Sequence, residues 1–550
     1  MFDVRTPMRD GVELSSDVWL PDADGKYPVI LVRLPYIKTT EFLKSAEFGA
    51  YFARHGYAYV VQDTRGRGDS DGKFDFYFPE AKDGYDSIEW LARQPWSNGR
   101  VCMMGVSYLA TVQWLAAKEK PPHLVCIAPT SPNGRYLDEA PTIGGAFLMS
   151  WALHWIDDTS GRISEGADAA ATDWTKVYAH RPLLTMDEAL GRRMPLYRNM
   201  LAHDTLDDYW KPIQLGPDDF SKIDIPVMTY TGWFDGDQTG ALYYWQGMHA
   251  RKGGARDEYL VIGPWTHIQS YLGGSEKIGD LDLAKDAVID NKAMHLAFFD
   301  HYLKQSTDRL DWPNVRVYVT GANVWRSFDA WPVPGGHEAR IYLTSGGRAN
   351  TADGDGALEW SAASGAPDAY AYDPKSPVPM ELDYSTFAGD RRKVEGRQDV
   401  LVYTSKTLDK PVEIIGEAAV ELYAASDARD TDFVATISDV QPNGEAILLG
   451  SRPVGAVRAR YRNGRSATPQ LLTPGEVVRY RIQLGAIGHA FLPGHRIRID
   501  ISSSASPMYN PNQNTGNPIA TDTEWKTAHQ RIFHDKDHPS ALVLPIAPPN

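Results

Sequence analysis

Three residues that could together activate a hydroxyl nucleophile stand at the ends of three apolar runs. Ser107 follows VCMMGV, Asp235 follows PVMTYTGWF, and His267 follows YLVIGPWT. A hydroxyl attacks a carbonyl poorly until a base removes its proton, and the base itself must be oriented by a carboxylate. A serine, a histidine and an aspartate brought together would therefore perform acyl transfer on an ester or an amide.

The segment around Ser107 has the pattern of a sharp turn from a strand into a helix. The serine of such a turn exposes its hydroxyl at the carboxyl edge of a sheet, and Gly105 allows the chain to bend tightly beside it. Leu109 stands where the general pattern has a second glycine. The alternative interpretation is that Ser107 only caps the following helix.

The chain order of these residues is typical of α/β-hydrolases, in which serine, acid and histidine each follow a strand in that order. Taken singly, Asp235 would more often be a turn residue and His267 a surface histidine. Their joint placement favours a serine hydrolase with Ser107 as nucleophile, His267 as base and Asp235 as orienting acid. This chemistry requires no cofactor and no metal.

The oxyanion of the tetrahedral intermediate needs hydrogen-bond donors. The backbone N–H of Tyr108, directly after the nucleophile, is one expected donor. The second should come from the loop after an earlier strand, and the PVILVR run leads to Tyr36. Plain packing is the alternative role for this phenol.

Strand and helix signals alternate along the first part of the chain, which predicts a mainly parallel sheet covered by helices. The alternation stops near Asn133, resumes near Pro217, and gives way after Ala330 to short strands between Gly, Pro and Asp clusters. The predicted fold class is α/β with a C-terminal all-β jelly roll. The predicted domains are a catalytic domain at 1–133 and 218–330, a helical cap at 134–217, and a jelly-roll β-sandwich at 331–550.

Composition narrows the range of partners. The 550 residues carry a net charge of −15, which argues against nucleic acid and anionic membranes. No apolar run is long enough to span a bilayer, and the N-terminal residues resemble no signal peptide. Only Cys102 and Cys126 occur, and we expect two unpaired core residues in a cytoplasmic protein. The expected partner is a small ester or amide, and the sandwich is a candidate homodimer face.

Several motifs together resemble the cocaine-esterase-like hydrolases, relatives of X-Pro dipeptidyl-peptidases and α-amino-acid ester hydrolases. They are RLPYIKT, QDTRGRGDSDGKF, GVSYLATVQW, TGWFDGD, GPWTH and FLPGHRIRIDISSS, and they extend over nearly the whole chain. The resemblance implies a hydrolase domain, an inserted cap and a C-terminal jelly roll. It also implies a nucleophile at Ser107, acid and base at Asp235 and His267, and an oxyanion hole from Tyr36 and Tyr108.

Two departures from the family pattern concern the substrate. Ala110 replaces the last glycine of the family's elbow, a mild change on a helix. Asp237 stands where cocaine-esterase-like members tend to carry an aromatic pocket residue, and this argues against a benzoyl-type substrate. Asp237 is a candidate partner for an ammonium or polar group, or else a solvated loop acid. The acidic residue that amino-ester hydrolases carry just after the nucleophile has no counterpart here. Trp151 and Trp155, one helical turn apart, are candidates to line the pocket from the cap.

Other functions remain as alternatives. The main one is an acylase or aminopeptidase-like hydrolase of amides, acting on β-lactam side chains, α-amino-acid esters or X-Pro peptides. Another alternative is a catalytically silent binding or carbohydrate-recognition protein built around the jelly roll. That interpretation requires one member of the triad to be missing, and all three are present in the sequence. The Gly66-Arg67-Gly68 run is not followed by a helix, as a dinucleotide loop would require. The polar residues around His534 and His538 are interpreted as a solvated loop rather than a metal site.

Overall fold

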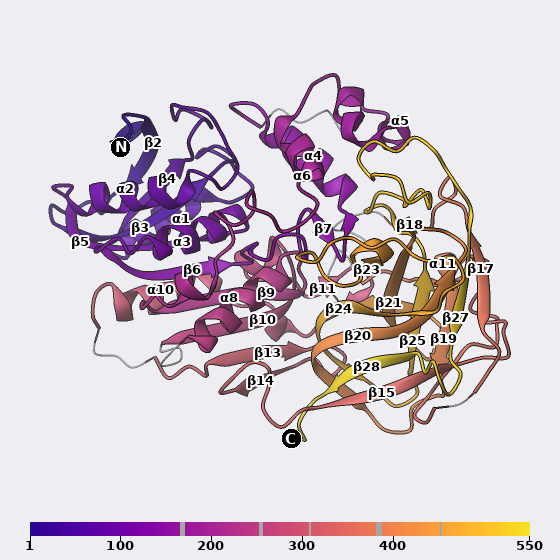
Figure 1. The fold of residues 1–550 in the computed structure, drawn as a ribbon. Helices are drawn as coiled ribbons and strands as arrows, with labels where there is room; N and C mark the ends of the chain where they lie inside the picture. Colours follow the sequence, from indigo (N-terminus) through magenta and orange to yellow (C-terminus); the bar gives the residue numbers. More distant parts are fainter. Residues whose placement is uncertain are drawn as a thin grey trace.

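The computed structural model describes residues 1–164, 171–251, 257–306, 310–362, 364–380, 388–450 and 454–549. Its two largest sheets have ten and twelve strands. Figure 1 shows the α/β part, in indigo to magenta, beside the all-β part, in orange to yellow. Helices α4 to α6 lie above the junction of these two parts.

The ten-stranded sheet has the order β1-β2-β4-β3-β5-β6-β9-β10-β13-β14. Its central strands, from β4 to β13, are parallel neighbours, and the outer pairs are antiparallel. The central runs are continuously apolar because strands of a parallel sheet are buried on both faces. The strands are β1 (Val4–Pro7), β2 (Glu13–Trp19), β3 (Tyr27–Leu34), β4 (Ala58–Asp63), β5 (Ser97–Val106), β6 (Leu124–Thr130), β9 (Val227–Phe234), β10 (Glu258–Thr266), β13 (Val315–Val319) and β14 (Val324–Phe328).

Helices connect these strands and pack in two groups, α1 with α10 and α3 with α2 and α8. Phe52 of α1 contacts Phe299 of α10, with ring centroids 5.8 Å apart. On α3, Trp114 stacks on Tyr244 of α8 at 4.6 Å, and α3 also packs against α2. The helices are α1 (Ser45–Arg54), α2 (Glu80–Ala92), α3 (Tyr108–Lys118), α8 (Gln238–Ala250), α9 (Gln269–Leu272) and α10 (Asn291–Tyr302), with a 3₁₀ turn at Lys285–Ala287. Two short strands, β11 (Lys277–Ile278) and β12 (Leu281–Asp282), form a separate hairpin.

Short helices dominate the stretch between β6 and β9, as the sequence predicts. They are α4 (Met149–Thr159), α5 (Trp174–Ala179), α6 (Pro195–Ala202) and α7 (Pro217–Phe220), with a 3₁₀ segment at Leu183–Leu190. The stretch predicted as a helical cap also holds two strands of two residues each, β7 (Thr142–Ile143) and β8 (Ala146–Phe147), which pair as a short hairpin.

The twelve-stranded sheet system is mostly antiparallel. Its main path is β17-β27-β20-β28-β15-β16-β19-β25-β21-β22, with β23 paired to β21 and β24 paired to β20. Its strands are β15 (His337–Thr344), β16 (Ala357–Glu359), β17 (Asp368–Tyr372), β19 (Leu401–Ser405), β20 (Val412–Ser426), β21 (Asp432–Val440), β22 (Ala446–Leu449), β23 (Gly455–Arg458), β24 (Val478–Phe491), β25 (Arg496–Ser502), β27 (Ala528–Phe533) and β28 (Ala541–Ile546). Strands β18 (Pro379–Met380) and β26 (Ser506–Pro507) pair separately, α11 covers Arg392–Glu395, and a 3₁₀ turn covers Ala459–Tyr461.

The two cysteines form a disulfide, which corrects the expectation of unpaired thiols. Cys102 of β5 and Cys126 of β6 face each other in the register of two adjacent parallel strands, and both are fully buried. The sequence places each in an apolar strand but not opposite the other, because that alignment depends on strand register. Among the described helices, none has both the length and the apolarity needed to cross a membrane.

Candidate active site

Ser107 occupies the turn between β5 and α3. Its backbone has φ 63° and ψ −126°, a conformation that non-glycine residues rarely adopt. A Cβ atom on Gly105 would lie 2.5 Å from the Cβ of Leu109, so the turn requires glycine at that position. The Ser107 side chain makes no capping hydrogen bond to α3. The helix-cap alternative therefore fails, and the hydroxyl is left for another role.

The acid and the histidine meet as predicted. His267 Nδ1 lies 2.7 Å from Oδ1 of Asp235, which joins the ends of β9 and β10. Asp235 is fully buried, and its Oδ2 accepts a hydrogen bond from Thr231 at 2.8 Å. The Asp237 backbone N–H donates to Oδ1 at 3.0 Å. These contacts hold the carboxylate in one orientation, which in turn fixes the imidazole.

Tyr36 lies beside the proposed nucleophile. Its phenol interacts with the Ser107 side chain and accepts a hydrogen bond from Trp155 Nε1 at 3.0 Å. Burial raises the pKa of Tyr36 to about 12, despite those two hydrogen bonds. The hydroxyl therefore keeps its proton and remains a donor at neutral pH. Packing alone does not describe this residue.

Tyr108 contributes its backbone rather than its side chain to the site. It is the first residue of α3, and the first N–H groups of a helix have no partner within the helix. Its buried phenol points away to Glu80 Oε1, at 2.9 Å, and stacks on Tyr77. The side chain thus anchors the turn, while the backbone N–H lies next to Ser107 without a partner inside the helix.

A cavity of about 790 Å³ contains the Ser107 and His267 side chains. Trp151 and Trp155 of α4 line it as the sequence predicts, stacked with ring centroids 5.7 Å apart. Helices α4 and α5 thus supply an aromatic wall opposite the strand ends. In the described chain, no lysine or arginine is among the residues that line this cavity.

Asp237 faces into the same cavity. Its Oδ2 lies 3.8 Å from Nε2 of His267, the nitrogen on the side away from Asp235. The side chain is 21% exposed, so the interpretation as a solvated loop acid was wrong. The imidazole therefore lies between two carboxylates, one on each ring nitrogen.

Glu139 is a second cavity acid, and sequence reasoning missed it. It lies in the irregular stretch after β6, where no periodicity or strand end marks it. Its carboxylate accepts hydrogen bonds from the backbone N–H groups of Gly134 at 2.9 Å, Arg135 at 3.0 Å and Gly240 at 2.7 Å. The acid missing directly after the nucleophile stays missing, but folding brings Glu139 into the cavity from a different segment.

The charges in the cavity alter one another's titration. Burial lowers the pKa of His267, but Asp235 and Asp237 raise it more, to about 9. Burial and Asp235 raise the pKa of Asp237 to about 6, against the opposing effect of His267. Burial, then Asp237, raises the pKa of Glu139 well above its usual value. Apart from histidine, no basic side chain of the described residues lines this cavity beside these carboxyl groups, which favours a positively charged group inside.

The all-β part of the chain helps position the acid loop. Gln238, directly after Asp237, donates from Nε2 to the Ala486 carbonyl at 3.0 Å and accepts from the Ala486 N–H at 2.8 Å. Ala486 belongs to β24. Since Gln238 is buried, this reciprocal pair ties the loop that carries both aspartates to the C-terminal sheet.

The residues near the C-terminus that were weighed as metal ligands have local partners. His534 is buried and its Nε2 lies 3.0 Å from Asp368, so the expectation that it is solvated was wrong. His538 Nδ1 lies 3.1 Å from Asp535. Over the described residues, no group of three or more potential ligands could hold a metal ion.

Comparisons with known proteins agree with this geometry. Residues 10–269 match the family model of X-Pro dipeptidyl-peptidase (S15 family), and residues 310–543 match its C-terminal non-catalytic domain. Cocaine esterase from Rhodococcus sp. (strain MB1 Bresler) is 37% identical, over 99% of this chain and 98% of its own.

Two solved structures are also similar over nearly the whole chain. An α-amino acid ester hydrolase is 27% identical with a TM-score of 0.88, over 99% of this chain and 96% of its own. An aminopeptidase from a marine sediment Thaumarchaeota archaeon is 26% identical with the same TM-score and coverage.

Proposed function

The chain belongs to the X-Pro dipeptidyl-peptidase (S15) family, among its cocaine-esterase-like members, and we propose that its serine ester hydrolysis is carried out by Ser107, His267 and Asp235. The observation that supports these roles is the 2.7 Å contact between His267 and Asp235 at a cavity that Ser107 also lines.

The proposed reaction has two halves. Ser107 Oγ attacks the ester carbonyl while His267 Nε2 takes its proton, and Asp235 stabilises the imidazolium through Nδ1. The oxyanion accepts hydrogen bonds from the Tyr36 hydroxyl and the Tyr108 N–H. Collapse breaks the bond to the alcohol, which leaves with the proton from His267. Water, deprotonated by His267, then attacks the acyl-enzyme and releases the acid and Ser107.

The test uses Ser107→Ala. We expect this variant to lose hydrolysis of p-nitrophenyl acetate and labelling by a fluorophosphonate probe, with unchanged circular dichroism. Ser160→Ala, on the exposed end of α4, serves as the matched control and should keep both. Labelling of Ser107→Ala at the parental rate would refute the assignment.

For the substrate, we propose an ester that carries an ammonium group close to the carbonyl. The supporting observation is the pair Asp237 and Glu139 in a cavity that no described lysine or arginine lines. An ammonium beside Asp237 would offset its charge, so that less negative potential would hold the proton on His267. The same arrangement suits an amide substrate with a free amino group as the second candidate.

Three substrates separate these choices: p-nitrophenyl acetate, the p-nitrophenyl ester of phenylalanine, and glycyl-prolyl-p-nitroanilide. We expect the amino ester to have the highest kcat/KM. A preference for the acetate would contradict the ammonium site, and a preference for the anilide would favour the peptidase alternative.

Cellular location and assembly are proposed from sequence alone. The low cysteine content, two in 550 residues, supports a cytoplasmic location. The disulfide between the two cysteines weakens that support, because the free thiols expected in a reducing compartment are paired. A thiol titration of unreduced protein from the cytoplasm would give no free thiol if the pair forms there. The homodimer is tested by sedimentation at several protein concentrations.

A further inference from the structure

The Gly66-Arg67-Gly68 run, which is no dinucleotide loop, places a fully buried arginine between α4 and the loop that carries Tyr36. We call residues 35–38, directly after β3, the Tyr36 loop. Both glycines of the run have a positive φ, 74° and 51°, and a Cβ atom on Gly68 would overlap the Asp63 carboxylate. The turn therefore needs glycine on either side of the buried arginine.

The Arg67 guanidinium binds backbone carbonyls of two separate segments. Its Nε donates to the Pro35 carbonyl, in the Tyr36 loop, at 2.5 Å. Its Nη1 donates to the carbonyls of Thr159, at 2.9 Å, and Gly161, and its Nη2 donates to that of Asp158 at 3.4 Å. Thr159 ends α4, where carbonyls lack partners within the helix and a positive charge is favourable. One side chain thus joins the end of α4 to the Tyr36 loop.

Neighbouring contacts strengthen this connection on both sides. The Gly68 N–H donates to the Arg162 carbonyl at 2.6 Å. The Arg162 guanidinium donates back to the carbonyls of Gly68, at 3.1 Å, and Ser70, at 2.8 Å. The buried Asp63 accepts a hydrogen bond from the Lys38 N–H, in the Tyr36 loop, at 2.6 Å. Segment 63–70 therefore holds the Tyr36 loop and the residues after α4 in one fixed relation.

The last turn of α4 also carries Trp155. Thr159 Oγ1 donates to the Trp155 carbonyl at 2.8 Å. The indole N–H can only donate, so the Tyr36 oxygen is the acceptor in the 3.0 Å contact between them. The single phenolic proton then remains for the side of Ser107, with which Tyr36 interacts. Accepting one hydrogen bond also strengthens the one that the same hydroxyl donates.

We propose that Arg67 and Trp155 are positioning residues of the oxyanion hole. Arg67 holds the end of α4 against the Tyr36 loop, and this keeps the Trp155 N–H on the Tyr36 hydroxyl. The phenolic proton is thereby directed at the oxyanion. This role rests on the proposed function, because it needs Tyr36 as an oxyanion donor. It gives α4 a part in the chemistry besides lining the cavity.

The test is a double-mutant cycle on kcat for p-nitrophenyl acetate. Each rate is expressed per active site, titrated to completion with the fluorophosphonate probe, so that unfolded chains do not count. Trp155→Phe keeps an aromatic ring without the N–H and should lower kcat by about tenfold. In a Tyr36→Phe background the same change should alter kcat by less than about twofold, because the hydroxyl that it orients is absent.

Arg67 is tested in the same cycle. Arg67→Lys keeps the charge, but a lysine cannot hold two segments with one planar group. It should lower kcat by about fivefold or more with KM within about twofold, because the surface that meets the substrate is unchanged. In the Tyr36→Phe background its effect on kcat should fall below about twofold. Arg67→Gln is neutral, keeps two N–H groups and carries the same expectations if the lysine variant does not fold.

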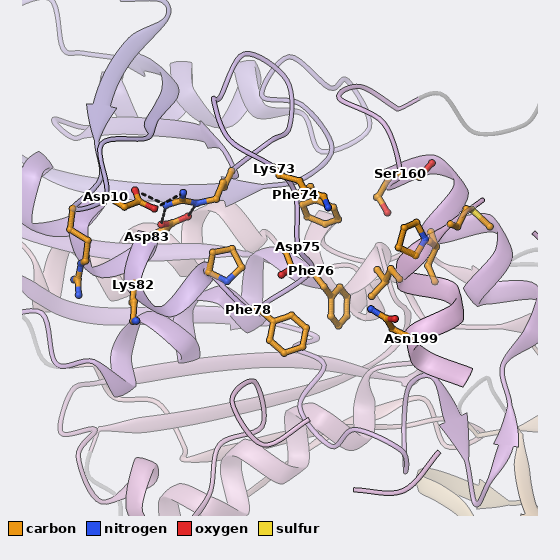
Figure 2. A pocket seen from close by; sticks show the side chains of 18 residues that line it. Asp10, Lys73, Phe74, Asp75, Phe76, Phe78, Lys82, Asp83, Ser160 and Asn199 are labelled. Atoms are coloured by element: carbon orange, nitrogen blue, oxygen red, sulfur yellow. Dashed lines mark hydrogen bonds and ion pairs between the residues drawn. The ribbon is translucent and has the colours of Figure 1, made fainter. Parts of the chain in front are cut away.

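Arg65, two positions before Arg67, supplies the matched control. It pairs with Asp83 at 2.7 Å and with Asp10 at 2.8 Å, the contacts drawn as dashed lines in Figure 2, beside a cavity of about 780 Å³ lined by segment 73–79. These contacts lie at the opposite side of that view from Ser160, the residue after α4. Arg65→Lys keeps the charge for both ion pairs and should leave kcat within about twofold of the parent.

The proposal is overturned if Trp155→Phe or a folded Arg67 variant lowers kcat by the same factor with and without the Tyr36 hydroxyl. It is equally overturned if a folded Arg67 variant keeps the parental kcat, or if Arg65→Lys loses as much as Arg67→Lys. Ser107→Ala tests the proposed function separately. Loss of hydrolysis in that variant, together with equal factors in the cycle, would leave the function in place and remove only the role of Arg67 and Trp155.

Discussion

Replacing Asp237 with asparagine removes one of the two carboxylates that flank His267. The removed charge lies 3.8 Å from Nε2. At that separation its attraction for the imidazolium is worth roughly 1 to 4 kcal/mol, between the limits of bulk water and a protein surface, or about 0.8 to 3 pKa units. Because this attraction raises the pKa of His267, to about 9 together with Asp235, Asp237→Asn should lower that pKa.

The assay is the pH dependence of kcat/KM, whose acid limb reports the base of the free enzyme. With p-nitrophenyl acetate, the acid limb of Asp237→Asn should move down in pH. The rate at pH 7 should rise by about tenfold, because more imidazole is unprotonated. With an amino-acid p-nitrophenyl ester the variant should instead lose activity at pH 7, since the ammonium loses its partner. One substitution thus changes the two substrates in opposite directions.

Asp537→Asn, an exposed change in the all-β part, is the control and should leave both profiles in place. An unmoved acid limb in Asp237→Asn would show that this carboxylate does not act on the imidazole. Equal losses for both substrates would show that it orients His267 rather than binding an ammonium.

Three further predictions follow from single contacts. Tyr36→Phe should lower kcat for p-nitrophenyl acetate by about 10²-fold by removing an oxyanion donor, and a parental rate would exclude that role. Gly240→Ala places a Cβ against the Pro132 carbonyl oxygen and 2.7 Å from the Glu139 carboxylate, so both must shift; it should raise KM for amino esters more than for the acetate, and equal effects would contradict the role of Glu139. Cys102→Ala/Cys126→Ala removes a disulfide whose ends are 24 positions apart. By the loss of chain-entropy stabilisation, it should lower the free energy of unfolding by about 3 to 4 kcal/mol, measured as a lower urea midpoint. An unchanged midpoint would show that the two thiols do not form the bond.

Most elements of the α/β part could be predicted because each is marked locally. The PVILVR run became β3, and the helix expected directly after the turn at Ser107 became α3. Strands β13 and β14 escaped prediction. They are five residues each, and β14 is only partly buried, so neither shows a solid apolar run. The division into 1–133 with 218–330, 134–217 and 331–550 stays a prediction.

The site residues likewise fall into those that the sequence predicts and those that it does not. Ser107, Asp235 and His267 could be found because the carboxyl ends of parallel strands meet at one edge of a sheet. Glu139 could not, since its place beside Asp237 depends on three backbone N–H groups, one of them from the distant Gly240. The cavity beside segment 73–79 is equally invisible in the sequence, because its walls come from segments far apart in the chain.

The sequence by itself determined the order of strands and helices, the turn at Ser107, and the three residue types that follow their strands. These depend on near neighbours in the chain, through apolar periodicity and backbone conformation. Only the tertiary structure decided that Cys102 faces Cys126, and that Asp237 and Glu139 share a cavity that no lysine or arginine of the described chain lines. Such pairings depend on strand register and on loop packing, which join residues that no local pattern connects.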